Sequence, residues 1–222
     1  MYIWDEVWTG DKYQNPQNRR EKVSYKIELF QELGADLRRL KTVADVGCGA
    51  GYFAKCLRSV ISGNVIAIDK SSVAIEKAKR LNQDQSIDYQ LGDAILPWPV
   101  PERLDAVYLI GLIEHVAERD EVLKHAYQSL KPGGELYICS SSKLSVFHFE
   151  KWLLEKLKRW RLGYQKDYRR RELIELLTAQ GFKIKHHHVS GCIRRQSMLS
   201  GLDRLLSRVG WGRYIFVIAE RT

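Results

Sequence analysis

The sequence has few cysteines, no two of them at the C-x-x-C spacing of zinc and redox sites, and no long apolar run. The four cysteines are scattered along the chain, at Cys48, Cys56, Cys139 and Cys192. We therefore expect reduced thiols and no metal site. No stretch of about 18 or more apolar residues is present, so no membrane-spanning helix is expected. Residues 1–6 have neither the basic start nor the apolar stretch of a signal peptide, and we expect a cytoplasmic protein.

The composition is that of a folded domain with one substantial core. The chain has 222 residues, of which 45% are hydrophobic and 28% are charged, and it contains neither an internal repeat nor a low-complexity tract. We expect a single domain over residues 1–222. Within it, residues 1–22 would form a strap or a lid, residues 40–142 a binding core, and residues 143–168 and 193–213 two helical insertions.

Basic residues are concentrated in the C-terminal third of the chain. Residues 1–147 hold 19 Lys and Arg against 20 Asp and Glu, whereas residues 148–171 hold 9 against 3 and residues 172–222 hold 8 against 4. A charge that only kept the protein soluble would be spread more evenly. The uneven distribution of the net charge of +9 therefore indicates a partner for this third.

A glycine-rich turn between an apolar run and a helical pattern is the most informative segment. Residues 43–46 predict a buried strand, and apolar residues recur at helical spacing over residues 53–61. Between them lie three glycines at alternate positions, Gly47, Gly49 and Gly51. Because glycine has no Cβ, the backbone can turn sharply here and approach a ligand closely. We therefore expect a binding loop.

Four more apolar runs follow, and helical patterns separate them. The runs are residues 65–69, 89–94, 104–110 and 130–138, the last of which begins with the end of a helix and a Gly-Gly turn. The first of them ends at Asp69, 18 residues after Gly51, where nucleotide-binding α/β folds place an acid that binds ribose hydroxyls. The alternation of strands with helices, such as the one over 72–81, predicts a parallel sheet.

With these motifs the chain resembles the class I S-adenosylmethionine-dependent methyltransferases, in particular the group that includes the ubiquinone and menaquinone biosynthesis enzymes. The resemblance covers roughly residues 40–142, and its G-x-G-x-G spacing with Asp45 two residues ahead differs from the G-x-G-x-x-G of nicotinamide-binding folds. It implies an α/β fold: a Rossmann-like, seven-stranded, mostly parallel sheet with helices on both faces and C-terminal helical insertions. The tail fits this fold, with a helix over 171–180 and strands over 182–186 and 214–219, the last of them antiparallel.

The resemblance also implies S-adenosylmethionine as the cofactor, S-adenosylhomocysteine as its product, and a set of cofactor-binding residues. They are Asp45, Gly47, Cys48, Gly49, Gly51, Asp69, Lys70, Asp93, Ala94, Ile110 and Gly111. In this set, Asp45 would order the loop and meet the ammonium group, Asp69 would bind the ribose diol, and Asp93 would bind the adenine amino group. Asp105 begins its strand, at the wrong end for such a site, and is expected to be structural.

Methyl transfer from a sulfonium needs neither a metal nor a covalent intermediate, because the positive sulfur already makes the methyl group electrophilic. The protein must hold donor and acceptor in line, and it can remove a proton. His115 follows the fourth strand at the carboxyl edge, where α/β sheets bind ligands, and is the candidate base. The alternative is a helix-start histidine that positions the loop. The three histidines at 186–188 would alternate between the two faces of a strand, so ordinary strand residues are expected there, with a histidine that faces the acceptor pocket as the alternative.

The two insertions combine apolar stripes with basic residues. In the first, one helical face would hold Phe149, Trp152, Leu153, Leu157 and Trp160. In the second, the residues at helical spacing are Met198, Leu202, Leu205, Leu206 and Val209. Three interpretations stay open: a lid over an amphipathic acceptor that also contacts an anionic membrane surface, an RNA-binding surface, or a helical cap that simply packs. The absence of an N-P-P-Y signature of base methylation weakens the second.

We therefore expect a methyltransferase that acts by in-line displacement on a small or amphipathic acceptor, such as a lipid-like, quinone-like or other secondary-metabolite molecule. The alternatives are an RNA methyltransferase that uses the basic C-terminal third, and a cofactor-binding regulatory protein without turnover. Nucleic acid is the less expected partner. A peripheral contact with an anionic membrane is an extension of the first interpretation.

Overall fold

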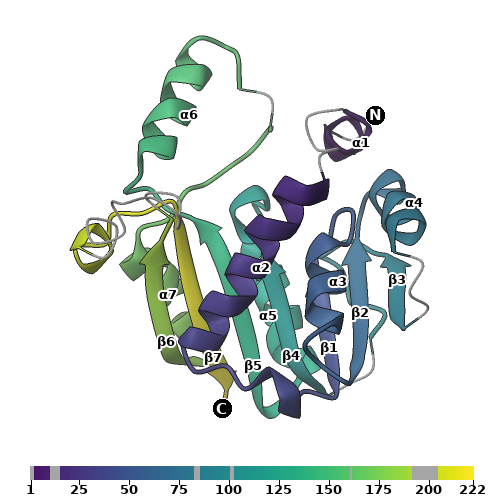
Figure 1. Cartoon of the computed structure of the whole chain (residues 1–222). Helices are drawn as coiled ribbons and strands as arrows, with labels where there is room; N and C mark the ends of the chain where they lie inside the picture. The colour runs from purple at the N-terminus through teal and green to yellow at the C-terminus, as the bar shows by residue number, and fades with distance from the viewer. Residues whose placement is uncertain (1–2, 11–15, 83–85, 101–102, 161, 192–204) are drawn as a thin grey trace.

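Seven strands form one sheet in the computed structural model, which describes residues 3–10, 16–82, 86–100, 103–160, 162–191 and 205–222. The strands are β1 (Thr42–Val46), β2 (Asn64–Asp69), β3 (Ile87–Leu91), β4 (Leu104–Ile110), β5 (Leu130–Ser141), β6 (Phe182–Ser190) and β7 (Tyr214–Arg221). Their order is β3-β2-β1-β4-β5-β7-β6 (Figure 1). Strands β1 to β5 pair in parallel, and β7 lies antiparallel between β5 and β6. The predicted Rossmann-like sheet is thereby confirmed.

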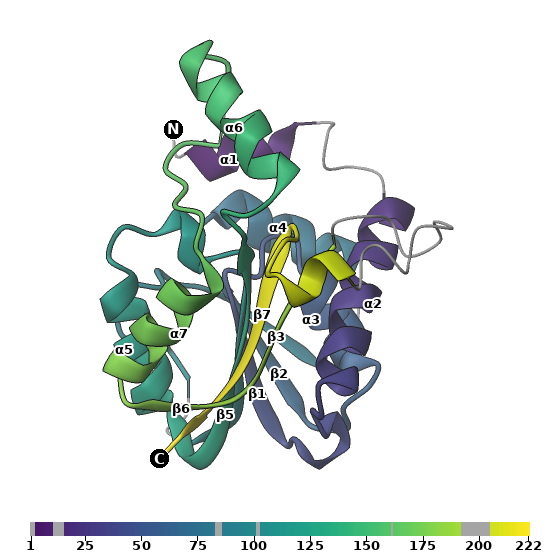
Figure 2. The same cartoon turned by 90° about the vertical axis from the view of Figure 1, so that its left-hand side faces the viewer.

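Helices cover both faces of the sheet. The α-helices are α1 (Ile3–Thr9), α2 (Pro16–Glu32), α3 (Tyr52–Arg58), α4 (Ser72–Leu81), α5 (Arg119–Ser129), α6 (Val146–Lys156) and α7 (Arg170–Ala179), and the short 3-10 helices are η2 (Leu37–Arg39) and η3 (Ile113–His115). Helices α2 and α3 lie on one face, and α5 and α7 lie on the other (Figure 2). Helices α1 and α6 stand beyond the carboxyl ends of the parallel strands (Figure 1).

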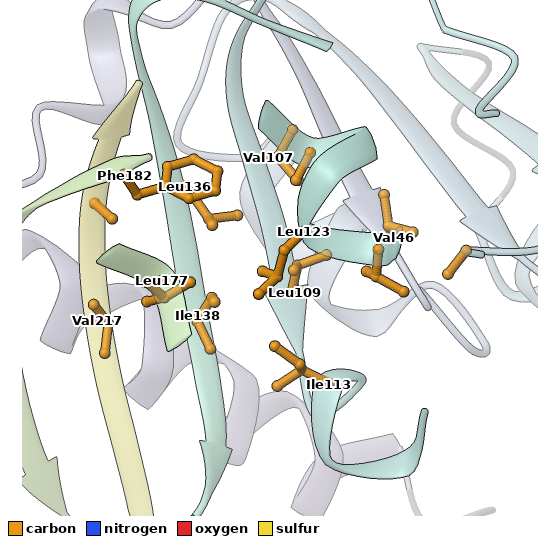
Figure 3. Packing of buried hydrophobic residues seen from close by; sticks show 14 of the residues in the cluster. Val46, Val107, Leu109, Ile113, Leu123, Leu136, Ile138, Leu177, Phe182 and Val217 are labelled. Atoms are coloured by element: carbon orange, nitrogen blue, oxygen red, sulfur yellow. The ribbon is translucent and has the colours of Figure 1, made fainter. Parts of the chain in front are cut away.

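The central strands are apolar on both sides because both sides are covered. On β1, Ala44 and Val46 belong to the core that contains α5 and α7, whereas Val43 belongs to the core on the side of α2 and α3. Figure 3 shows the first of these cores, in which Leu123 of α5 and Leu177 of α7 meet the strands. This two-sided burial explains why the strands read as continuous apolar runs in the sequence.

Helix α2 is fixed to the sheet by aromatic packing. Phe30 of α2 is buried, and its ring centroid lies 6.4 Å from that of Tyr108, 5.2 Å from that of Tyr137 and 5.4 Å from that of Phe216. All three contacts are edge-to-face, the arrangement that the ring quadrupoles favour. Helix α2 is thus held across β4, β5 and β7.

The first long helix differs from its prediction at both ends. Apolar residues recur at helical spacing from Val23 to Leu37 and predict a helix over 23–39. The observed helix α2 begins earlier, at Pro16, where the fixed φ of proline suits a first helical position. It ends at Glu32, and Gly34 follows with a φ of 99°, a conformation that glycine adopts without strain. Residues 37–39 form the separate turn η2.

The fifth strand begins earlier than predicted. The sequence suggested a helix end at residues 130–132 and then a Gly-Gly turn, but Leu130 already pairs with Leu104 of β4. Glu135 then pairs with Ala106, so residues 131–134 form an irregularity within β5. The helical pattern was misleading because Leu130 is buried in the same core as the last turn of α5.

The first insertion holds a shorter helix than its apolar stripe suggested. Helix α6 ends at Lys156, and Leu157 is its C-cap residue. Trp160 therefore lies beyond the helix, where its ring packs edge-on against Phe147 at 6.2 Å. The part of the stripe that lies on α6 itself is Phe149, Trp152 and Leu153.

Only the last part of the second insertion lies among the described residues. Residues 205–208 are helical, and Leu205 is exposed there. Met198 and Leu202 lie outside the described residues, so the longer helix expected around them stays a prediction.

Candidate active site

The glycine loop after β1 adopts the conformation that its glycines predict. Gly47, Gly49 and Gly51 have φ angles of 75°, 54° and 73°, which residues with a Cβ rarely adopt. The amides of Gly47 and Cys48 both donate to the carbonyl of Ile68, at 2.8 and 3.0 Å. The loop is therefore turned back onto the end of β2, which brings its second glycine to the acid at that strand's tip.

Asp69 holds that glycine by a charged hydrogen bond. Its Oδ2 accepts from the amide of Gly49 at 2.8 Å, and its Oδ1 accepts from the amide of Ser71 at 2.9 Å. Burial raises the pKa of Asp69 above its usual range, and the backbone hydrogen bonds oppose this rise. A carboxylate has about four acceptor positions, so capacity remains for further donors such as a diol. The sequence predicted the position of this acid but not its role as a brace of the loop.

Asp45 is a buried acid with an unused acceptor. Its exposed fraction is 1%, and its Oδ2 has no hydrogen-bond partner among the residues that the structure describes. Burial, and after it the negative charge of Asp69, raise the pKa of Asp45 to about 7, while the positive charge of Lys26 lowers it. An orphaned carboxyl oxygen at the base of a glycine loop fits a cationic or hydrogen-donating ligand such as an ammonium group.

Asp93 and Lys70, two of the predicted cofactor-binding residues, form an ion pair with each other. Lys70 Nζ lies 2.5 Å from Asp93 Oδ2, and the amide of Ile95 donates to Asp93 Oδ1 at 3.3 Å. Strand β3 ends at Leu91, so Asp93 lies in the turn after the strand. Ala94 beside it is buried. The tips of β2 and β3 are thus joined through side chains.

The end of β4 is anchored by a buried glutamate that the sequence reasoning did not single out. After Ile110, Gly111 takes a φ of 76° and donates to the carbonyl of Cys139 at 2.8 Å. Glu114, in the 3-10 turn that follows, is 3% exposed and accepts three hydrogen bonds at 3.1 Å, from Ser140 Oγ and from the amide and Oγ of Ser141. An acid inside the apolar stretch at 109–116 is the signal that could have identified it.

His115 is held by its neighbours in an orientation that suits a base. Its Nδ1 lies 3.1 Å from the carbonyl oxygen of Tyr164, and the ring of Trp4 meets it edge-on with centroids 4.8 Å apart. A carbonyl only accepts hydrogen bonds, so in the neutral ring the proton is assigned to Nδ1, which leaves Nε2 as the acceptor. The geometry therefore allows His115 to take a proton at Nε2.

A second oriented histidine lies on α6 and was missed by the sequence reasoning. His148 Nδ1 lies 2.6 Å from Oδ2 of Asp167, a fully buried side chain, and Gln165 Nε2 donates to the other oxygen at 2.7 Å. Buried Lys151 donates to the carbonyl of Gln165 at 2.6 Å. This cluster attaches α6 to the segment at 164–168. Nothing in the spacing from 148 to 167 reveals such a pair.

Two other sequence features lie elsewhere on the sheet. Asp105 accepts hydrogen bonds from the amides of Lys41 and Thr42, both at 2.8 Å, and pairs with Lys131 at the amino end of β4, which confirms its structural role. The histidines at 186–188 lie on β6. Within the described ranges, no group of three or more His, Cys, Asp or Glu side chains is arranged to hold a metal ion.

Comparisons with known proteins relate this part of the chain to methyltransferases. Residues 44–138, somewhat less than half of the chain, match the family described as Methyltransferase domain. It is 25% identical over 154 residues to the ubiquinone biosynthesis O-methyltransferase of Pseudomonas putida strain W619, a match that covers 65% of this chain and 66% of that protein. The chain thus spans just under two thirds of the length of this relative.

Solved structures share the whole fold. An S-adenosylmethionine-dependent methyltransferase from Thermotoga maritima superposes with a TM-score of 0.71 at 18% identity, covering 99% of both chains. A geranyl diphosphate methyltransferase, solved with geranyl diphosphate and sinefungin, superposes with a TM-score of 0.65 at 16% identity, covering 90% of this chain and 77% of that one. Among the described helices of this protein, none is both long and apolar enough to cross a membrane.

The first prediction concerns Asp69. A charged acceptor that takes hydrogen bonds from a diol contributes about 1.5–3 kcal/mol per bond, so Asp69→Asn and Asp69→Ala should each weaken S-adenosylhomocysteine binding at least about tenfold. Titration calorimetry measures the affinity, and a thermal melt checks that each variant is folded. Asp88→Ala, which removes an exposed acid from β3, is the matched control and should bind normally. Unchanged affinity of both Asp69 variants would mean that another residue holds the ligand.

The second prediction concerns the pH dependence of stability. The pKa of Asp45 is about 7 in the folded protein, whereas a carboxyl in an unfolded chain has a pKa of about 3.9. Between these values the folded state holds a proton that the unfolded state has released, so this residue lowers the stability as the pH rises from about 4 to 7. Asp45→Asn removes this contribution.

We therefore compare the unfolding free energies of Asp45→Asn and the wild type. As the pH rises from about 4 to 7, the difference should shift in favour of the variant by up to about 1.4 kcal/mol per pH unit. Urea unfolding at four or five pH values measures it. A difference that does not change with pH would show that Asp45 titrates normally.

Proposed function

We propose that the protein is an S-adenosylmethionine-dependent methyltransferase that acts on a small or amphipathic acceptor. The observation that carries the proposal is the orphaned, buried Oδ2 of Asp45 under a glycine loop that Asp69 braces, at the carboxyl edge of the sheet. When bound, the cofactor supplies an electrophilic methyl group. Asp45 would receive its ammonium group and Asp69 its ribose diol. Asp93, Ala94 and the backbone after β4 would complete the binding set.

We propose that His115 is the general base that takes a proton from the methyl acceptor. It lies directly after β4, its Nε2 is left as an acceptor, and Trp4 shields one side of the ring. A positioned general base typically contributes about 10²–10⁴-fold to a proton transfer. Glu114 positions it, because the hydrogen bonds of this buried acid fix the η3 turn against β5.

The relatives and the surface support an amphipathic acceptor. One relative is named for ubiquinone biosynthesis, and one structural neighbour was solved with a geranyl diphosphate. Both names describe molecules with a long apolar part. In this chain, exposed apolar side chains gather on α6 and on residues 205–211, beyond the carboxyl edge of the sheet. We refer to Val146, Phe149, Trp152, Leu153, Leu157, Leu205, Val209 and Trp211 as the apolar rim.

We further propose that the apolar rim contacts an anionic membrane surface, from which an amphipathic acceptor would be taken. Phe149, Trp152 and Trp211 also line a cavity of about 350 Å³ with Lys143 and His148, so aromatic and cationic groups meet at one place. Basic residues flank the helix, and residues 148–171 carry 9 basic against 3 acidic side chains. A lipid surface would satisfy both features, whereas RNA would pair with the charges and leave the apolar side chains exposed.

The third prediction tests turnover and the base. Purified protein incubated with methyl-labelled S-adenosylmethionine should label a component of a quinol, phenol or lipid pool, and it should not label an RNA pool. His115→Gln should lower the turnover number at least about 100-fold while S-adenosylhomocysteine affinity stays unchanged, because Gln can keep a hydrogen bond but cannot take a proton at neutral pH. Labelling of RNA alone would favour the RNA methyltransferase, and cofactor binding without any labelled acceptor would favour the regulatory protein.

The fourth prediction tests the membrane contact. The protein should co-sediment with vesicles of phosphatidylglycerol and phosphatidylcholine, less so as salt is raised, since basic residues contribute roughly 1 kcal/mol each near such a surface. Phe149→Glu combined with Trp152→Glu should abolish sedimentation without changing S-adenosylhomocysteine affinity. Leu96→Glu introduces the same charge at an exposed apolar position outside the rim and serves as control. Equal sedimentation of the rim variant and the control would refute the contact.

A further inference from the structure

Helix α1 lies across the candidate cofactor site, and Trp8 packs on the glycine loop. A Cβ built on Gly49 would come within 2.2 Å of Cζ2 and 2.5 Å of Cη2 of the Trp8 ring. The indole thus occupies the side of Gly49 that the missing side chain leaves open. That open side is what allows a ligand to approach the backbone of a glycine loop, so ring and ligand compete for the same space.

Three more contacts hold α1 to elements of the site. Lys77 Nζ of α4 donates to the carbonyl of Trp8 at 2.9 Å. Ser71 Oγ, directly after β2, donates to Asp5 Oδ1 at 2.6 Å. At the other end of α1, Trp4 meets the ring of His115. The helix therefore links the tip of β2 to the turn after β4.

Helix α1 is a short element that contributes no residue to either buried core. The helix has only seven residues, and none of them is buried. A helix of that length is marginal in water without tertiary contacts. Its attachment also places the carboxylate of Asp5 near that of Asp69, a like-charge pair that opposes closure.

Space for the ring exists beside the loop. Trp8 borders a cavity of about 400 Å³ at the outer side of α3 and α4, lined also by Tyr52, Val73, Lys77 and Leu81 among others. The indole can therefore leave Gly49 without any rearrangement of the sheet. Lys77, which donates the hydrogen bond to the carbonyl of Trp8, lines the same cavity. This hydrogen bond therefore acts as a latch that holds Trp8 in its position on Gly49.

We propose that α1 is a gate, closed in this structure by Trp8 on Gly49, and that cofactor entry requires the indole to leave the glycine loop. This inference rests on the proposed function only in naming the ligand that competes with Trp8. Because the apparent affinity falls by the fraction of molecules that are open, any change that removes the closed state should tighten binding. If Trp8 instead formed a wall of the cofactor site, its removal would weaken cofactor binding.

The fifth prediction uses Trp8→Ala and the latch variant Lys77→Met. Both should raise the association rate constant of S-adenosylhomocysteine, measured by stopped flow, at least about fivefold and tighten its dissociation constant by a similar factor. Lys79→Met removes an exposed lysine from the same helix and is the matched control, with kinetics like the wild type. Slower association or weaker binding in Trp8→Ala would make Trp8 a wall and overturn the gate.

Hydrogen exchange of the amides in residues 3–9 provides a readout that does not depend on catalysis. Exchange should be faster in Lys77→Met than in Lys79→Met without ligand, and S-adenosylhomocysteine should accelerate it in the wild type. Slower exchange on ligand binding would show that α1 closes over the cofactor, contrary to the proposal. If the wild type and every variant fail to bind S-adenosylhomocysteine, the proposed function fails and the gate fails with it. Normal binding without the kinetic difference refutes the gate alone.

Discussion

The hydrogen bond from the amide of Gly49 to the carboxylate of Asp69 is the contact on which the candidate site depends. It joins the loop after β1 to the tip of β2 and fixes the glycine loop in its left-handed conformation. Asp45 is buried beneath that loop, and the charge of Asp69 contributes to the rise of its pKa. Through Ser71, the turn after Asp69 also reaches Asp5, so the position of α1 follows from the same strand end. The glycine loop, the buried Asp45 and the N-terminal helix therefore form one connected unit.

The region around His115 depends on a different anchor, Glu114. This buried acid accepts from the end of β5, and its backbone carbonyl accepts from the amide of Lys166 at 2.7 Å. The segment at 164–168 is thereby placed above β4, where Tyr164 orients His115 and where Asp167 orients His148. Glu114 thus fixes the end of the first insertion against the sheet, and α6 stands above that edge (Figure 1).

Most of the fold followed from the sequence, whereas much of the side-chain arrangement did not. Strand β4 and helix α4 were predicted with their observed bounds. A largely apolar run of seven residues indicates a buried strand, and apolar residues at helical spacing over ten residues indicate a helix. The start of α2 and the beginning of β5 were wrong, since terminal residues depend on tertiary packing. Contacts between distant segments, such as Glu114 with Ser141 or Trp8 with Gly49, cannot be found from spacing. They arise only when the sheet brings the strand ends to one edge.

The position of β7 has a consequence for the order in which the sheet can form while the chain is being synthesised. This strand comes last in sequence among the seven but lies second from one edge of the sheet, with β5 on one side and β6 on the other. Residues 182–190 can therefore join the sheet only after residues 214–221 have been made. Until then the chain on the ribosome has an open edge at β5, and the residues of β6 have no strand to pair with. The half of the sheet that carries the glycine loop has no such dependence, so a nascent chain can form that half first.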